Sequence, residues 1–151
     1  QGTGVFDDFP TYDEWIVPFE PDNPEPNMFV MQDYHFGKLP VWINGNAYFN
    51  GAVAFKKEAD HFINTDDKVY VNLVEKDGQY TLQTNVYEVL GNYTTSIIDS
   101  DVLGEAFEPE ERFENPDGST IIFDRDYFGN HRSLKAVPGP FATAEVATWN
   151  L

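Results

Sequence analysis

One stretch of the sequence constrains the fold more than any other, because it alternates side chains on both sides of a turn. In residues 69–74, and again in residues 80–87, apolar side chains recur at every second position. Alternate residues of a strand point to opposite faces of a sheet, so this period of two is typical of β-strands. Asp77 and Gly78 lie between the two runs, and an Asp-Gly pair readily adopts the positive φ angles of a hairpin turn. Residues 68–90 are therefore predicted to form a β-hairpin.

Outside this hairpin, the sequence favours short strands separated by turns. Asn-Gly pairs stand at positions 44–45 and 50–51, and an Asn-Pro-Asp-Gly sequence follows at 115–118. Such sequences readily adopt the backbone angles of tight turns. Short strands are predicted at residues 121–123 and over residues 145–151. Short strands at turn-marked intervals, with no long helix, are typical of a β-sandwich.

Helical structure is predicted in two places, each about one turn long. Residues 11–15 begin with Thr11, which can cap a helix, and Glu14 stands three residues later, as in a capping box. Residues 58–62 are predicted to form the second turn of helix. The fold class that follows from these patterns is all-β.

The N-terminal segment, residues 1–27, combines many prolines with many aromatic side chains. A proline keeps the residue before it out of the helical region, so this segment is expected to be extended or looped. Aromatic residues between Phe6 and Phe19 are too numerous for a disordered tail. We therefore predict an extended docking segment that packs on polypeptide beyond the sandwich, either the remainder of a parent enzyme or a second chain.

The net charge of the chain restricts the classes of partner that it can bind. Asp and Glu number 26 against 9 Lys and Arg, which gives a formal net charge of −17 at pH 7. Such a field repels nucleic acid and anionic membrane surfaces, so neither is expected as a partner, whereas a neutral carbohydrate is compatible with it. No apolar run approaches the ~20 residues of a membrane-spanning helix. No cofactor is expected, because phosphate-binding glycine loops are absent.

The absence of cysteine excludes a disulfide framework, but a domain of this size does not need one outside the cell. The chain opens at Gln1 rather than Met, which leads us to expect a mature product or a piece of a longer protein. The expected location is secreted or periplasmic.

Aromatic residues are the main candidates for a binding site, since the C–H faces of sugars pack on aromatic rings. Trp42 stands in an apolar run, which favours burial in the core over a role in a site. The candidate carbohydrate-binding residues are Trp15, Tyr34, His35, Trp42, Tyr48 and His131.

Pairs of acidic residues are candidates for a calcium site or for a glycosidase pair. Asp99 and Asp101 stand two residues apart, as do Asp124 and Asp126, and Glu108 heads a third cluster. Residues at i and i+2 of a strand share a face, which suits the oxygen ligands of calcium or two carboxyls ~5 Å apart. In so acidic a chain, solvated or turn-capping carboxylates are the more frequent case. The three histidines are too scattered to predict a zinc site, so no metal is assigned. No Ser lies in a Gly-x-Ser-x-Gly sequence, and no catalytic residue is assigned either.

Four stretches of the sequence carry a family resemblance. Residues 124–132, with the pattern Asp-x-Asp-Tyr-Phe-Gly-Asn-x-Arg, resemble a closing phrase of secreted right-handed parallel β-helix proteins that break down polysaccharides. Residues 9–15, 39–51 and 106–118 are similar to the C-terminal quarter of bacterial β-xylosidases of glycoside hydrolase family 120. In that family a β-sandwich interrupts a parallel β-helix.

The resemblance implies a fold, a division of the chain and a function. The fold is a β-sandwich with flanking segments that complete a right-handed parallel β-helix. The division is residues 1–27 as the docking segment, 28–98 as the sandwich and 99–151 as closing β-helix strands and loop. The chain would shape the substrate cleft of a secreted enzyme acting on xylan-type polysaccharide or oligosaccharide, with the catalytic carboxylates elsewhere. The alternatives are a non-catalytic carbohydrate-binding domain and a self-assembling extracellular β domain.

Overall fold

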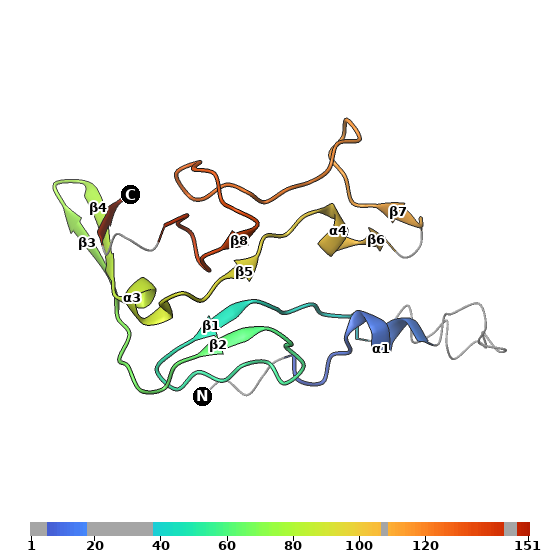
Figure 1. The fold of residues 1–151 in the computed structure, drawn as a ribbon, viewed down its shortest axis with the longest axis horizontal. Coiled ribbons are helices and arrows are strands. Elements are labelled where there is room, and N and C mark those ends of the chain that lie inside the picture. The colour runs from blue at the N-terminus through green and yellow to red at the C-terminus, as the bar shows by residue number, and fades with distance from the viewer. Residues whose placement is uncertain (1–5, 18–37, 107–108, 144–147) are drawn as a thin grey trace.

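The structure, a computed structural model, describes residues 6–17, 38–106, 109–143 and 148–151. These residues form an elongated molecule of short strands and short helices (Figure 1), which confirms the predicted all-β class. In chain order the elements are α1 (Tyr12–Ile16), β1 (Asn46–Tyr48), β2 (His61–Ile63), β3 (Val71–Lys76), β4 (Gln79–Thr84), α3 (Val86–Leu90), β5 (Thr95–Ser96), α4 (Ser100–Leu103), β6 (Glu105–Ala106), β7 (Glu111–Arg112), β8 (Lys135–Ala136) and β9 (Thr148–Asn150). Within the described ranges, no helix has the length and apolar character needed to cross a membrane.

β3 and β4 form the predicted antiparallel hairpin, joined by Asp77 and Gly78 as a two-residue loop. The φ angles of these two residues are 53° and 78°. Two consecutive positive φ values define the turn whose twist matches that of the flanking strands. The alternation ends earlier than predicted, because α3 begins at Val86. The side chain of Asn85 accepts a hydrogen bond from the Tyr70 N–H at 2.9 Å and so closes the ladder at this point.

β9 pairs with the other edge of β4, so the C-terminal strand belongs to a sheet of this chain. It confirms the predicted final strand, in a shortened form. β3 is left at the edge of the three-stranded sheet, and all its residues are exposed. Val71 is 63% exposed and Leu73 is 60% exposed, so this end of the sheet carries uncovered apolar surface.

The core is small and aromatic. Its buried members are Tyr87, Leu90, Phe141 and Trp149, with Phe62 among the half-buried residues packed against them. The rings of Phe141 and Trp149 are stacked, with centroids 4.3 Å apart and planes 10° apart. These side chains come from β2, α3, β9 and the loop before β9, so the core joins segments far apart in the sequence.

β1 and β2 pair in parallel, although no helix connects them. Their connection turns at Asn50 and Gly51, with φ angles of 53° and 83°. A parallel crossover usually contains a helix, and a helix-free crossover is instead a feature of β-solenoids and β-helices. The helical turn predicted at residues 58–62 is wrong. The carboxylate of Glu58 accepts the Asn46 N–H at 3.0 Å, which draws this segment alongside β1 as a strand.

Short ladders tie the C-terminal half together, with β5 antiparallel to β8 and β6 antiparallel to β7. Residues 115–118 form the predicted turn, closed by a backbone hydrogen bond. The strand predicted at residues 121–123 is reduced to one isolated bridge at Ile122. The N–H of Ile121 donates to the Ser100 hydroxyl at 2.8 Å, so it does not take part in a sheet ladder.

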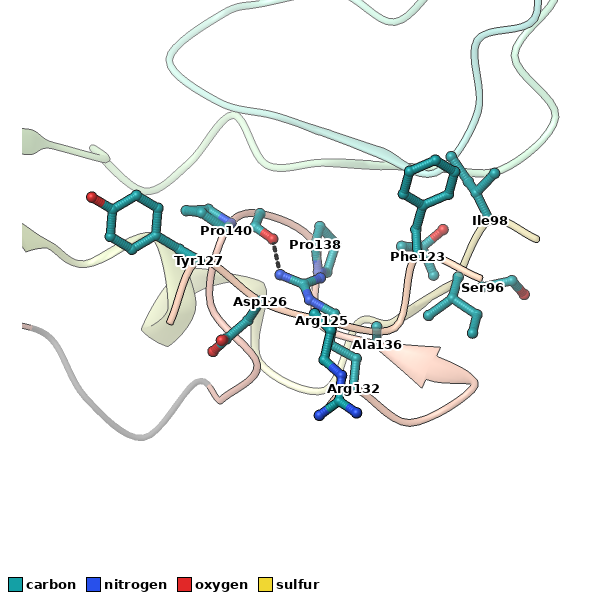
Figure 2. Close-up of a pocket in the computed structure, with 13 residues that line it drawn as sticks. Ser96, Ile98, Phe123, Arg125, Asp126, Tyr127, Arg132, Ala136, Pro138 and Pro140 are labelled. Atoms are coloured by element: carbon teal, nitrogen blue, oxygen red, sulfur yellow. Dashed lines mark hydrogen bonds between the residues drawn. The ribbon is translucent and has the colours of Figure 1, made fainter. Parts of the chain in front are cut away.

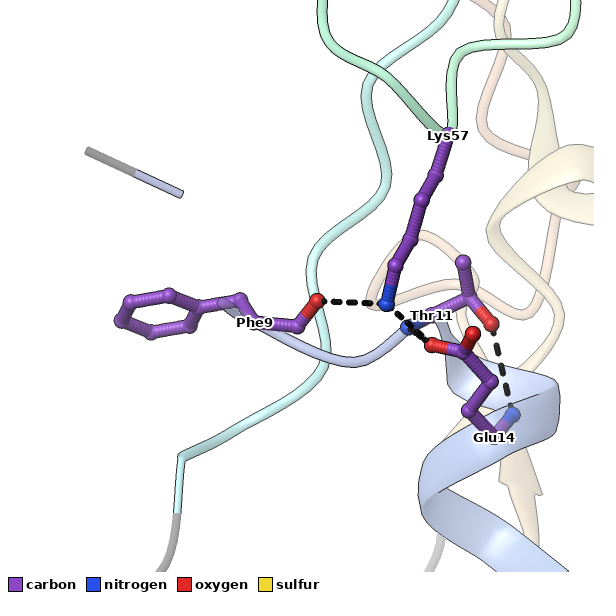
Figure 3. Close-up of polar contacts among 4 residues, drawn as sticks. All are labelled: Phe9, Thr11, Glu14 and Lys57. Carbon is purple, nitrogen blue, oxygen red and sulfur yellow. Dashed lines mark hydrogen bonds and ion pairs between the residues drawn. The ribbon is translucent and has the colours of Figure 1, made fainter. Parts of the chain in front are cut away.

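The described part of the predicted docking segment packs on its own chain (Figure 3). The ammonium of Lys57 donates to the Phe9 carbonyl at 3.0 Å and forms an ion pair with the Glu14 carboxylate. The Val41 N–H donates to the Pro10 carbonyl, also at 3.0 Å. Residues 6–17 thus find partners within the chain, whereas residues 18–27 lie outside the described ranges.

The division into residues 1–27, 28–98 and 99–151 remains a prediction. Hydrogen-bonded ladders cross the second boundary, since β4 pairs with β9 and β5 pairs with β8.

Candidate functional site

One wall of the candidate site is α1, which begins with the predicted capping box. The Glu14 N–H donates to the Thr11 hydroxyl at 3.3 Å, and the Thr11 N–H donates to the Glu14 carboxylate at 2.9 Å. The hydrogen bond from Lys57 and those from Thr11 lower the pKa of Glu14. A helix of five residues has little stability alone, so these contacts hold it in place. Tyr12 and Trp15 lie three residues apart on it and share a face, with ring centroids 6.0 Å apart.

A groove of about 730 Å³ lies between α1, the segment around Trp42 and the region of α4 and β6. We call it the aromatic groove, because Tyr12, Trp15, Trp42 and Phe113 all line it. Trp42 is 60% exposed, so its ring is available to a ligand. Glu105 adds a carboxylate to the lining. Concave, mostly apolar sites with a few polar groups are the usual form of small-molecule sites, and exposed rings in them suit sugar C–H faces.

A smaller hollow, of about 280 Å³, shares Tyr12, Val41 and Trp42 with the aromatic groove. Asp13 and Lys57 stand among its other lining residues and give it polar groups. Because the same rings line both hollows, a ligand longer than one sugar unit has aromatic surface to follow.

The predicted candidates separate into three groups. The structure brings Trp15 and Trp42 together in the aromatic groove. The prediction that Trp42 is buried in the core is wrong, because its segment runs along the surface outside the sheets. Tyr48 and His131 are engaged elsewhere, while Tyr34 and His35 lie outside the described residues.

Tyr48 belongs to a polar cluster around the buried carboxylate of Glu58. Its hydroxyl donates to Glu58 at 2.6 Å, and the side-chain amide of Asn46 donates to the same carboxylate at 2.9 Å. Burial raises the pKa of Glu58, but the hydrogen bonds from Tyr48 and Asn46 outweigh it and hold the pKa below its ordinary value. Burial, and to a smaller extent the hydrogen bond to Glu58, raise the pKa of Tyr48. This cluster holds β1 against the following segment.

The paired acidic residues mostly hold turns, as the more frequent case predicted. Asp99 caps α4 by accepting the N–H groups of Asp101 and Val102, each at 3.0 Å. Asp101 forms an ion pair with Arg112. Glu108 lies outside the described residues. In the part of the chain that the structure describes, no three His, Asp or Glu side chains gather in a way that could hold a metal ion.

His131 lies beside the acidic pair Asp124 and Asp126 rather than in the aromatic groove. Its Nε2 stands 3.0 Å from the Asp124 carboxylate, and its side chain is exposed. A role for His131 in sugar binding therefore stays a prediction.

Sequence reasoning missed several residues of the aromatic groove. Tyr12 could have been found, since it stands three residues before Trp15 in the predicted helical turn. Leu103, Glu105 and Phe113 reach the groove from far along the chain, and no local pattern points to them.

Comparison with solved structures found a likeness to XylC, whose structure was determined in complex with xylose. The TM-score is 0.72 at 24% sequence identity, over 97% of this chain. No family model and no curated protein sequence matches the chain. The chain spans 22% of the length of the XylC chain, so the likeness concerns one part of that protein. At this identity it shows the fold, which fits the expected arrangement of β-helix and β-sandwich.

Proposed function

We propose that this chain is a carbohydrate-binding part of a glycoside hydrolase that acts on xylan-type polysaccharide or oligosaccharide. Its aromatic groove contributes to the substrate cleft, and the catalytic carboxylates belong to another part of the enzyme. The enzyme is secreted or periplasmic and related to the β-xylosidases of glycoside hydrolase family 120.

The observation that carries this proposal is the exposure of aromatic rings within one concave site. Exposed aromatic side chains cost free energy unless a ligand or partner covers them. Here Trp42 and Tyr12 are both exposed and both line one groove, whose size suits an oligosaccharide. The likeness to XylC supports a carbohydrate as the ligand, since that structure contains xylose.

The tryptophans themselves provide the test. Trp15 and Trp42 line the aromatic groove, whereas Trp149 is buried in the core. Titration of the chain with xylotriose and xylohexaose should change the emission of the two tryptophans that line the groove. The Trp42→Ala variant should weaken binding by roughly tenfold, the loss of one well-placed aromatic contact.

Two controls make this test specific. The Trp149→Phe variant should keep the binding, because it leaves the groove intact. Cello-oligosaccharides of equal length should bind less tightly than the xylo-oligosaccharides, and equal affinity would contradict a xylan-type substrate. Robust hydrolysis of an aryl xyloside by the 151-residue chain would contradict the statement that its catalytic carboxylates lie elsewhere.

A second candidate function is self-assembly as an extracellular β domain. The uncovered edge of β3 favours it, because an exposed apolar edge strand is a template for pairing with another chain. Light scattering and electron microscopy separate the two: concentration-dependent filaments without oligosaccharide binding would favour assembly.

A further inference from the structure

A second pocket, of about 500 Å³, has a lining that differs from that of the aromatic groove (Figure 2). It lies between β5, β8 and the loop that holds the closing phrase of the sequence. We call it the arginine pocket, because Arg125 and Arg132 both line it. The rings of Phe123 and Tyr127 and the prolines at 138 and 140 give the same pocket apolar surface.

Arg125 has most of its donor capacity free. Its side chain is 62% exposed, and its Nε stands 3.6 Å from the Asp124 carboxylate. Its Nη1 donates to the Gly129 carbonyl at 3.3 Å. A guanidinium carries five N–H donors in a planar fork, so these two long contacts leave donors for a ligand at the pocket.

Arg132 is held more firmly and places a fixed positive charge in the wall. Its guanidinium donates to the Val137 carbonyl at 3.2 Å and to the Gly139 carbonyl. Its Nε is enclosed and has no acceptor among the described residues. An enclosed donor without an acceptor is costly, and a ligand oxygen is one group that could satisfy it after a small shift of the side chain.

Asp126, the carboxylate of this pocket, is already occupied. One oxygen accepts the N–H groups of Phe128 and Asn130 at 2.9 and 2.7 Å. The other accepts the Asn130 amide at 3.1 Å and the Ala142 N–H at 3.0 Å. Burial raises the pKa of Asp126, but these hydrogen bonds outweigh it and lower the pKa overall. Four hydrogen bonds from N–H groups therefore offset the charge of Asp126. This carboxylate is paired with those groups rather than with the arginines, which stay available to a ligand.

The neighbouring charges are balanced, which is unusual in a chain of net charge −17. Asp124 contacts Arg125 and also lies 3.0 Å from His131 Nε2. Two arginines and two carboxylates therefore stand in this region, and one of the carboxylates, Asp126, already accepts four N–H groups. An anion approaching this surface meets less repulsion here than a uniformly acidic surface would give.

We propose that the arginine pocket binds the carboxylate of an acidic sugar, a uronic-acid unit carried by the substrate. This inference deepens the proposed function and rests on it for the carbohydrate class. The planar fork of Arg125 suits a carboxylate, which it can bind through two parallel hydrogen bonds. Phe123 and Tyr127 offer apolar surface to the sugar ring that carries it.

The test compares an acidic and a neutral ligand on the 151-residue chain. The probes are xylotriose, xylotriose bearing a glucuronic-acid branch, and free glucuronate. Nuclear magnetic resonance follows the Nε–Hε signals of the arginines. The acidic probes should shift the signals of Arg125 and Arg132, whereas Arg112, which pairs with Asp101, should stay unchanged. Raising the ionic strength from about 0.05 to about 0.5 M should weaken the binding of the acidic probes and leave the binding of xylotriose unchanged.

Variants of two arginines provide a matched pair. Arg125→Ala should weaken the binding of the branched ligand by roughly tenfold, because it removes a charge-assisted hydrogen bond. Arg125→Lys should restore part of the loss, because it keeps the charge without the fork. Arg112→Ala removes an exposed arginine elsewhere and should leave the affinity unchanged.

The outcomes separate this inference from the function on which it rests. If xylotriose binds in the aromatic groove while the branched ligand binds no more tightly, the arginine pocket has no such role and the proposed function stands. Equal loss in Arg125→Ala and Arg112→Ala would also overturn the inference. If no oligosaccharide binds but free glucuronate still shifts Arg125, the pocket is an anion site and the proposed function is wrong. If none of the probes binds, both are wrong.

Discussion

Two tryptophans of this chain lie in opposite environments. Trp149 is 8% exposed and stacks on Phe141 in the core, whereas Trp42 is 60% exposed on the rim of the aromatic groove. Both stand in short stretches that are rich in apolar residues. The difference arises from what surrounds them. Trp149 lies on a strand paired with β4, and Trp42 lies on a segment that joins no sheet.

Whether an aromatic side chain is buried or exposed to a ligand therefore depends on segments distant in sequence. The core draws Trp149 together with Tyr87 and Leu90, which α3 contributes more than fifty positions earlier. Trp42 lines the aromatic groove together with Leu103 and Phe113, and an open volume of about 730 Å³ lies among the lining residues. One region is closed by its own chain, and the other is open to a ligand.

The largest expected effect is the loss of stability when the buried Trp149 is removed. Trp149→Ala should lower the free energy of unfolding by about 3–5 kcal/mol, because it removes a stacked ring and leaves a cavity. Trp42→Ala should lower it by less than about 1 kcal/mol, since the ring is already exposed. Urea denaturation followed by circular dichroism measures both. Equal losses for the two variants would mean that the core and the groove do not differ as described.

Burial of a polar side chain should also make its substitution costly, as Glu58 illustrates. Glu58 is 6% exposed, yet polar, and it accepts hydrogen bonds from Asn46 and Tyr48. Glu58→Ala should cost about 2 kcal/mol, because it leaves enclosed donors without their acceptor. Glu111→Ala, on exposed β7, is the matched control and should change stability by less than about 0.5 kcal/mol.

The acid sensitivity of the same carboxylate gives a third prediction. The folded pKa of Glu58 lies below its ordinary value of 4.5, so its ionised form stabilises the folded state. This contribution is present above the unfolded pKa and is lost as the pH falls below 4.5 and through the folded pKa. Glu58→Gln should therefore lose less stability than the unaltered chain between pH 5 and pH 3, as measured by urea denaturation. A parallel fall in both proteins would assign the acid sensitivity to other carboxylates.

Two glycines provide a smaller, matched contrast between the core and the exposed hairpin. Gly78 has a φ of 78° and open space around it, whereas a Cβ on Gly139 would stand 2.8 Å from the Tyr87 hydroxyl. Gly78→Ala should cost about 1 kcal/mol from backbone strain alone. Gly139→Ala should cost more, about 2 kcal/mol, because it adds a clash with the core to the strain. Thermal denaturation that ranks the two variants in the opposite order would show that Tyr87 yields easily.

The hairpin and the capping box could be predicted from the sequence because each depends on neighbouring residues. The Asp77-Gly78 turn and the spacing of Thr11 and Glu14 are local patterns, and the structure confirms both. The aromatic groove was predicted only through Trp15 and Trp42. Its opposite wall, with Phe113, depends on how α4 and β6 approach α1, and such long-range placement leaves no periodic trace in the sequence.

The smallest effect on stability is expected for the contacts that position α1 at the aromatic groove. Lys57→Met removes the ammonium that joins Glu14 and the Phe9 carbonyl. An exposed ion pair contributes little to global stability, so the denaturation midpoint should stay nearly unchanged. The orientation of Trp15 should nevertheless loosen, because a helix of five residues depends on its contacts for its position. Quenching of tryptophan emission by acrylamide should therefore rise, and it should not rise in Lys76→Met, a lysine on the distant hairpin. Unchanged quenching in Lys57→Met would show that the Lys57 contacts are not needed to position the wall of the groove.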